Sequence, residues 1–148
     1  MIKSLETNYK KAQHFDEVFP FLQSLVDNPE TNVSKYNCNA ILGISEKLGI
    51  QFNRFCWSSE LPHVGNSNDL LVSLTELVGG TAYLTGKGAV AYLDEAVYKT
   101  ADVRLIHQDF EHPEYSQHNS VSFIAGLSIV DALMNIGYKG VTELLTCS

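Results

Sequence analysis

The feature that most constrains the fold of this chain is a stretch at residues 81–95 that reads as a strand running through glycines into a helix. The segment 81–85, Thr-Ala-Tyr-Leu-Thr, has the β-branched and aromatic residues that favour a strand. Gly86 and Gly88 let the backbone bend and let a ligand approach closely, and residues 89–93 begin a helix. This order of elements is typical of an α/β protein, which binds its ligands where strands lead into helices.

The start of that helix also predicts an anion-binding turn. Exposed backbone amides at a helix start favour an anion, and Lys87, between the two glycines, adds a mobile positive charge. The turn lacks the full P-loop spacing and the three-glycine fingerprint of dinucleotide-binding folds. A plain glycine turn with a solvent-facing lysine therefore stays open as an equal alternative.

The length of 148 residues fits one domain with its own core and is short for two, so we expect a single α/β domain over residues 1–148. Hydrophobic residues make up 45% and charged residues 18%, as in a folded globular protein rather than a disordered one. The net charge of −7 and the pI near 5.1 argue against non-specific binding to DNA, RNA or anionic membranes, which requires a positive field.

Residues 1–11 lack the apolar core of a signal peptide, and no stretch reaches the length that spans a bilayer. We therefore expect a cytoplasmic protein without a membrane span. Cys38, Cys56 and Cys147 are odd in number and widely spaced, which argues against a disulfide framework and against a structural zinc site. We expect free thiols, with Cys56 packed inside an apolar strand.

Apolar periodicity divides the chain into alternating helices and strands. The predicted helices are 14–26, 33–48, 66–78, 94–99 and 122–136, the last of which is expected to end at Gly137. The predicted strands are 50–57, 81–85 and 103–107. A strand, a helix and a second strand in this order predict a parallel pair with a right-handed crossover. The expected fold class is α/β, a three-layer-like domain with a small, mostly parallel sheet flanked by helices.

The loops after the three predicted strands are expected to converge at one end of the sheet, in a crevice suited to a small ligand. The candidate ligand-binding residues in and beside these loops are Ser58, Gly86, Lys87, Gly88, Tyr92, Tyr115 and Gln117. The serine has an alternative role as the cap of the next turn. The tyrosines have an alternative place in the core, with the hydroxyl reaching solvent.

His112 is the candidate general base, because histidine ionises near neutral pH and this one lies in a polar loop. Its alternative is a surface histidine packed on Pro113. A metal site built from His107, Asp109 and His112 has donors that suit zinc or manganese, but the spacing matches no standard ligand set. We therefore expect no metal, and the sequence names no cofactor.

Asp131 and Asn135 lie four residues apart on one predicted helical face, with Ser128 three residues earlier. We expect this stripe to form hydrogen bonds with the polar loop at residues 108–120 before it, since buried polar groups are usually satisfied locally. A catalytic role for Asp131, with Ser59 as nucleophile and His112 as base, is the alternative. No G-x-S-x-G turn supports that hydrolase arrangement.

Several blocks in fixed order resemble the WbqC-like family, which is found in bacterial O-antigen and other surface-polysaccharide gene clusters. The blocks lie at residues 8–15, 37–50, 58–61, 83–86, 92–94, 112–117 and 127–137. The resemblance implies a role in surface-polysaccharide biosynthesis. The reaction it suggests is acyl or aminoacyl transfer to a nucleotide-activated amino sugar, by a transferase or a ligase.

Two departures from the family pattern shape this expectation. The chain resembles the C-terminal part of family members, without the N-terminal block and its His-Gln-Pro-like opening. Family members also tend to carry a Lys-Thr pair after the glycine at 65, where this chain has Asn66 and Ser67, so part of an anion site is expected to be lost. Two alternatives stay open: an enzyme that binds a nucleotide-sugar or another anionic small molecule, and a non-catalytic fragment or partner subunit that binds a separate N-terminal subunit of a split WbqC-like protein.

Overall fold

The structure, a computed structural model, describes residues 1–51, 53, 55–118 and 120–146. The chain divides into two compact units, of which unit 1 comprises Met1–Phe52 and His112–Ser148 and unit 2 comprises Asn53–Glu111. Unit 2 is therefore an insertion in the sequence of unit 1. The expectation of one domain over residues 1–148 stays a prediction.

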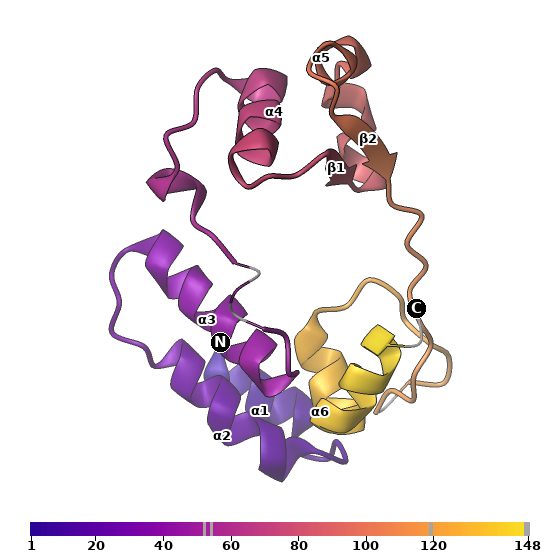
Figure 1. Cartoon of the computed structure of the whole chain (residues 1–148). Helices are drawn as coiled ribbons and strands as arrows, with labels where there is room; N and C mark the ends of the chain where they lie inside the picture. Colours follow the sequence, from indigo (N-terminus) through magenta and orange to yellow (C-terminus); the bar gives the residue numbers. More distant parts are fainter. Residues whose placement is uncertain (52, 54, 119, 147–148) are drawn as a thin grey trace. The chain divides into compact units, whose positions relative to one another are not determined.

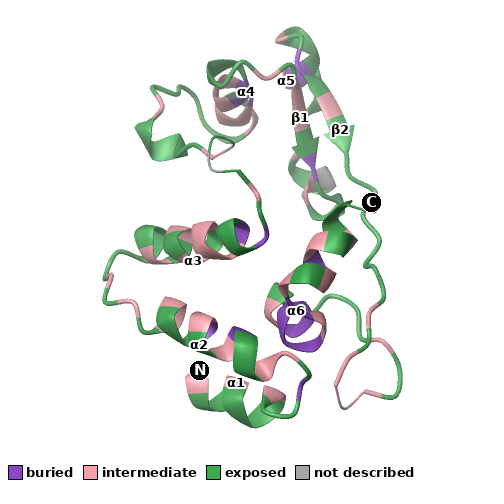
Figure 2. Cartoon of the chain, turned by 60° about the horizontal axis from the view of Figure 1, so that its bottom comes forward, coloured by how far each residue is buried: buried purple, intermediate pink, exposed green. Residues whose placement is uncertain are grey.

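Unit 1 is helical (Figure 1). Its helices are α1 (Ile2–Tyr9), α2 (Phe15–Val26), α3 (Val33–Lys47) and α6 (Ile129–Thr146). They share one core, in which Val18, Leu133 and Met134 are completely buried, and Figure 2 shows a buried stretch along α6. Burying each such side chain contributes about 1.5–3 kcal/mol, so this core is the main source of stability in unit 1.

Local sequence explains where α2 and α3 begin. Asp16 and Glu17 lie in the first turn of α2, where negative charge interacts favourably with the helix dipole. Asn32 caps α3, since its side-chain oxygen accepts a hydrogen bond from the Lys35 N–H at 3.1 Å. The predicted helices 14–26 and 33–48 are confirmed to within a residue at each end, whereas α1 is an element that the sequence analysis did not predict.

Helix α6 differs from its prediction at both ends. Residues 122–128 are not helical, and the hydroxyl of Ser128 accepts the Val130 N–H just where the helix starts. Gly137, expected to end the helix, is instead a kink with φ 69° and ψ 179°, and the chain continues helical to Thr146. A Cβ at Gly137 would lie 2.5 Å from Nδ1 of His14, so this close approach requires glycine.

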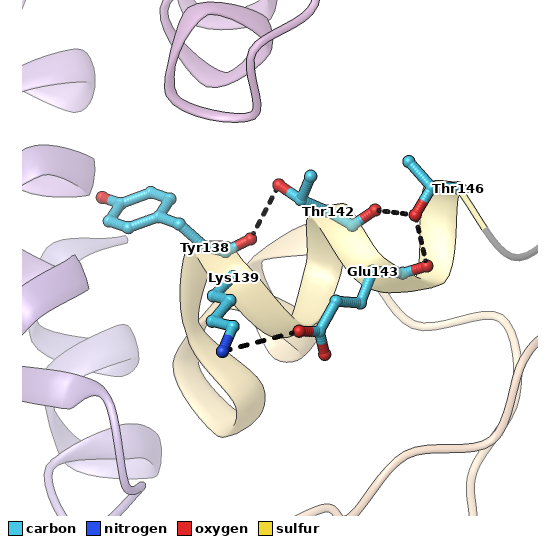
Figure 3. A network of polar contacts seen from close by, with 5 residues as sticks. All are labelled: Tyr138, Lys139, Thr142, Glu143 and Thr146. Atoms are coloured by element: carbon cyan, nitrogen blue, oxygen red, sulfur yellow. Dashed lines mark hydrogen bonds and ion pairs between the residues drawn. The ribbon is translucent and has the colours of Figure 1, made fainter.

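The part of α6 beyond the kink is held by contacts one turn apart (Figure 3). Lys139 pairs with Glu143 at 3.7 Å, and the Thr142 hydroxyl donates to the Tyr138 carbonyl at 3.0 Å. The Thr146 hydroxyl donates in turn to the Thr142 carbonyl at 3.2 Å. No helix among the described residues is both long enough and apolar enough to cross a membrane.

Unit 2 combines helices with a parallel pair of strands. Its elements are the 3₁₀ helix η2 (Ser58–Glu60), α4 (Ser67–Leu77), β1 (Ala82–Thr85), the 3₁₀ helix η3 (Lys87–Tyr92), α5 (Glu95–Thr100) and β2 (Arg104–His107). Strands β1 and β2 are parallel, with Leu84 beside Ile106. Val72, Tyr98 and Val103 form the core. The predicted α/β class with a small parallel sheet is confirmed, and the sheet has two strands in the described part of the chain.

The predicted strand at 50–57 is wrong, because none of its described residues is in a strand. Ile50 packs against the core of unit 1, whereas Cys56 and Trp57 are exposed, so this apolar run does not form one buried face. The parallel pair therefore joins β1 to β2 and not 50–57 to 81–85. Cys56 is an exposed free thiol rather than a core residue, and Cys38 is also free. Residues 52 and 54 of the predicted strand, and the third cysteine at 147, lie outside the described residues.

Candidate functional site

The candidate site in unit 1 is built around the carboxylate of Asp131, which is 5% exposed in the first turn of α6. One carboxylate oxygen accepts hydrogen bonds from the Tyr115 hydroxyl at 2.8 Å and from Nε2 of Gln117 at 3.1 Å. The other accepts the Tyr9 hydroxyl at 2.9 Å. A buried carboxylate is costly unless it is hydrogen-bonded, and three donors from two other segments of the chain satisfy this one.

The same contacts keep the two tyrosines protonated. Burial, followed by the hydrogen bond to Asp131, raises the pKa of Tyr9 from 10.0 to about 12. Burial is also the main cause that raises the pKa of Tyr115, with the hydrogen bond to Asp131 second. Because both hydroxyls donate to Asp131, the geometry favours a role for Asp131 in positioning the loop, and its catalytic role stays a prediction.

Asn135 holds the same loop one helical turn further along α6. Its side-chain oxygen accepts the His118 backbone N–H at 2.7 Å, and its Nδ2 donates to the Asp131 carbonyl at 2.8 Å. Both side-chain amide atoms of Gln117 also bond the backbone of Ile124, at 2.7 and 3.0 Å. The prediction that Asp131 and Asn135 form hydrogen bonds with the polar loop is therefore confirmed.

A hollow of about 430 Å³ opens beside this loop, lined by residues 114–117 and 120–123. Tyr115 and Gln117, both predicted as ligand-binding residues, contribute to its wall. The Tyr115 ring meets Phe123 edge-on, with 5.3 Å between ring centroids. The loop thus presents a fixed polar surface to solvent, of a size that accepts a small molecule.

His112, the predicted general base, also belongs to unit 1 and is exposed. Its Nε2 lies 4.0 Å from the point where a Cβ on Gly126 would stand, so it is beside the turn at that glycine. The two other members of the metal set considered above, His107 and Asp109, belong to unit 2. Over the described residues, no three His, Cys, Asp or Glu side chains are grouped so as to hold a metal ion.

The predicted glycine turn at Gly86 and Gly88 lies in unit 2, between β1 and η3. Lys87 forms an ion pair with Asp109, and both side chains are largely exposed. Nothing lies within 4 Å of a Cβ built on either glycine, so no close approach requires them. The element that follows is a 3₁₀ helix and not the predicted α-helix, which weakens the helix-dipole argument for an anion. Anion binding by this turn stays a prediction.

The other predicted residues of unit 2 lie on its surface. Ser58 and Ser59 are in the exposed helix η2. Tyr92 is 80% exposed, which excludes its alternative place in the core, and its backbone carbonyl accepts a hydrogen bond from Asn68 at 3.3 Å. The structure therefore brings Tyr115, Gln117 and Asp131 together in unit 1, whereas the serines, the glycine turn and Tyr92 belong to the other unit.

Sequence reasoning missed Tyr9, which supplies the third donor to Asp131. It ends a helix that no periodicity argument predicted, and its partner lies 122 residues away in the sequence. The available signal was a tyrosine that follows an amphipathic turn near the start of the chain.

Comparison with known proteins identifies the family of this chain. The model of the WbqC-like protein family matches residues 1–143. The chain belongs to the WbqC-like family. The matched region includes α1, the polar loop, Asp131 with its three hydrogen-bond donors, and the whole of unit 2.

This WbqC-like chain is also similar to the uncharacterized protein Rv1507c of Mycobacterium tuberculosis. The two are 29% identical over 147 residues, which are 98% of this chain and 63% of that relative. The chain therefore spans less than two thirds of the length of the relative it matches. No solved structure matches it.

Proposed function

We propose that this WbqC-like protein acts in the biosynthesis of bacterial surface polysaccharides, where it transfers an acyl or aminoacyl group to a nucleotide-activated amino sugar. Family membership supports the pathway. The observation that carries the proposal is the hollow beside a polar loop whose side chains are locked by the buried carboxylate of Asp131. Binding sites work best when their contact residues are held in place by a second layer of hydrogen bonds, and this loop has that arrangement.

The hollow offers groups that suit a sugar. Glu114, Ser116, Ser120 and Ser122 line it, and carboxylate and hydroxyl oxygens bind sugar hydroxyls. Tyr115 adds an aromatic ring, which packs against the apolar face of a sugar. This combination of a few polar groups and an aromatic surface is typical of small-molecule sites.

In the proposed reaction, the amine of the sugar attacks the carbonyl carbon of an activated acyl donor. A C–N bond forms, the bond between the carbonyl and its leaving group breaks, and the leaving group departs with the electron pair. The amine loses one proton, and His112 is the proposed base, since histidine ionises near neutral pH. Lys87 is proposed separately as an anion-binding residue of unit 2, because an exposed ion pair such as that with Asp109 opens at little cost.

The proposal is tested with UDP-glucosamine as acceptor and acetyl-coenzyme A as donor. We expect saturable binding of UDP-glucosamine that shifts the NMR signals of residues 114–123, and formation of the acetylated sugar. His112→Ala should lower the transfer rate by about 10²–10⁴-fold and leave binding intact. His63→Ala, which removes an exposed histidine of unit 2, is the matched control. If the folded protein shows no binding of UDP-glucosamine and no transfer, the proposal is contradicted.

A second proposal, that the chain is a non-catalytic fragment or a partner subunit, is favoured by the sheet of unit 2. Leu84 and Ile106 are neighbours in the β1–β2 register, yet they are 59% and 37% exposed. Parallel sheets are normally covered on both faces. This proposal predicts a complex with the segment of Rv1507c that lies outside the matched region, measured by light scattering and weakened by Ile106→Asp. The absence of a complex, together with transfer activity, favours the enzyme.

A further inference from the structure

A second cavity, of about 670 Å³, lies in unit 2. Its lining includes His107, from the metal set considered above, and none of the candidate catalytic or ligand-binding residues. It is bordered by α5 and β2 and by the turn that joins them. Its volume falls within the range of roughly 300–1,000 Å³ that is typical of small-molecule sites. Its floor includes the apolar side chains of Val103 and Leu105.

Two positively charged residues, Lys99 and Arg104, line this cavity and are called the cation pair below. Lys99 is in the last turn of α5 and Arg104 is the exposed first residue of β2. Among the described residues, neither takes part in an ion pair. A guanidinium and an ammonium that are free of carboxylate partners are suited to bind a phosphate.

Two carboxylates, Glu95 and Asp102, line the same cavity and are called the carboxylate pair. Asp102 has φ 56°, a left-handed conformation that aspartate adopts more readily than most residues, and it makes the turn from α5 into β2. Carboxylates accept hydrogen bonds from ammonium and hydroxyl groups. Because the two pairs cancel in formal charge, the cavity matches a ligand that carries both signs better than it matches a simple anion.

Tyr98 adds an unsatisfied group to the wall of the cavity. The residue is 1% exposed, and its ring lies 5.7 Å from that of Tyr83 between centroids. Its buried hydroxyl has no hydrogen-bond partner among the described residues. Burial raises the pKa of this hydroxyl, so it remains protonated and able to donate. A buried polar group without a partner is unfavourable and rare, so an acceptor brought beside this hydroxyl would be stabilising.

We propose that this cavity binds a small phosphorylated molecule that also carries an amine and hydroxyl groups, of the class of an amino sugar phosphate. The phosphate binds the cation pair, the amine binds the carboxylate pair, and the carbon skeleton lies on Val103 and Leu105. This binding site is independent of the acyl transfer proposed above, and no chemical step is assigned to it.

The site is tested by calorimetric and NMR titration of the full chain with glucosamine 6-phosphate. Glucose 6-phosphate, glucosamine and inorganic phosphate are the comparison probes, each of which lacks one part of the expected ligand. We expect saturable binding of glucosamine 6-phosphate that shifts the signals of residues 95–107, and affinities at least about tenfold lower for the other three.

Substitutions then separate the two pairs. Arg104→Gln should weaken the binding of glucosamine 6-phosphate by about tenfold or more, and Lys99→Gln should repeat this effect with the second cation. Asp102→Asn keeps the shape of the side chain and the left-handed turn. It should weaken the binding of glucosamine 6-phosphate by about tenfold and leave the binding of glucose 6-phosphate unchanged. The control is Lys139→Gln, which removes an exposed cation of α6 and should leave affinity unchanged.

Three results overturn the proposal. The first is no saturable binding of any probe to the folded chain. The second is an affinity for inorganic phosphate or glucose 6-phosphate equal to that for glucosamine 6-phosphate. The third is unchanged affinity in both Arg104→Gln and Lys99→Gln.

Discussion

The hydrogen bond from Tyr9 to Asp131 can be removed with almost no change of shape by Tyr9→Phe. The two oxygens are 2.9 Å apart in a part-buried site. A hydrogen bond to a charged acceptor contributes about 1.5–3 kcal/mol. Since Asp131 keeps Tyr115 and Gln117 as donors, we expect the lower part of that range, a loss of about 1.5–2 kcal/mol in the free energy of unfolding at pH 7.

The pKa of Tyr9 adds a pH dependence to this loss. Folding raises the pKa from 10.0 to about 12, so the stabilisation is complete below pH 10 and is lost as the pH rises through 12. A shift of two pKa units corresponds to about 2.7 kcal/mol, which partial solvent exposure reduces to about 1.5 kcal/mol. The stability difference between the wild type and Tyr9→Phe should therefore shrink at alkaline pH.

Urea unfolding followed by far-UV circular dichroism, at pH 7 and at pH 11, measures both effects. Tyr36→Phe is the control, because the Tyr36 hydroxyl donates to the neutral carbonyl of Val26 at 3.0 Å and should cost only about 1 kcal/mol. A double-mutant cycle of Tyr9→Phe with Asp131→Asn isolates the pair. A coupling energy below about 0.5 kcal/mol would refute the reasoning, since the coupling energy between residues in contact normally exceeds that value.

Three further substitutions test the core, the kink and the glycine turn by urea unfolding. Gly137→Ala should lower the free energy of unfolding by about 3 kcal/mol, because of left-handed strain and overlap with the neighbouring imidazole of His14. Gly49→Ala, at φ +74° with open space around it, should lower it by about 1 kcal/mol, and equal losses would contradict this account. Leu133→Ala should cost about 2–5 kcal/mol, and the half-exposed Leu145→Ala under about 0.5 kcal/mol. Lys87→Ala breaks only an exposed ion pair and should change stability by less than about 0.5 kcal/mol, so a larger loss would show that the turn has a structural role.

Helices α2 and α3 of unit 1 were predictable because their apolar residues recur with helical spacing and their ends carry clear signals. Asn32 before α3 is an example, since its side chain does cap the helix. The run at 50–57 was not predictable in the same way. A short apolar run is compatible with a strand or with an irregular connection, and only the tertiary structure divides its residues between the core at Ile50 and solvent at Trp57.

The candidate site was predictable where its contacts are local. The spacing of Asp131 and Asn135 on one helical face was sufficient to predict their hydrogen bonds to the preceding loop. The donor from Tyr9 was not predictable, because no sequence pattern specifies which of seven tyrosines reaches a carboxylate so far along the chain. Gly137 was read as a helix end for a sound local reason, but the packing of His14 makes it a kink inside a longer helix.

The insertion of unit 2 within unit 1 sets an order of events during synthesis. Every residue of unit 2 lies within 53–111, so this unit can fold on short-range contacts soon after it leaves the ribosome. The apolar faces of α1, α2 and α3 must wait for α6, which supplies Leu133 and Met134 to the shared core. Until then these three helices remain exposed to chaperones and to aggregation, while the segment that separates them from α6 is already folded.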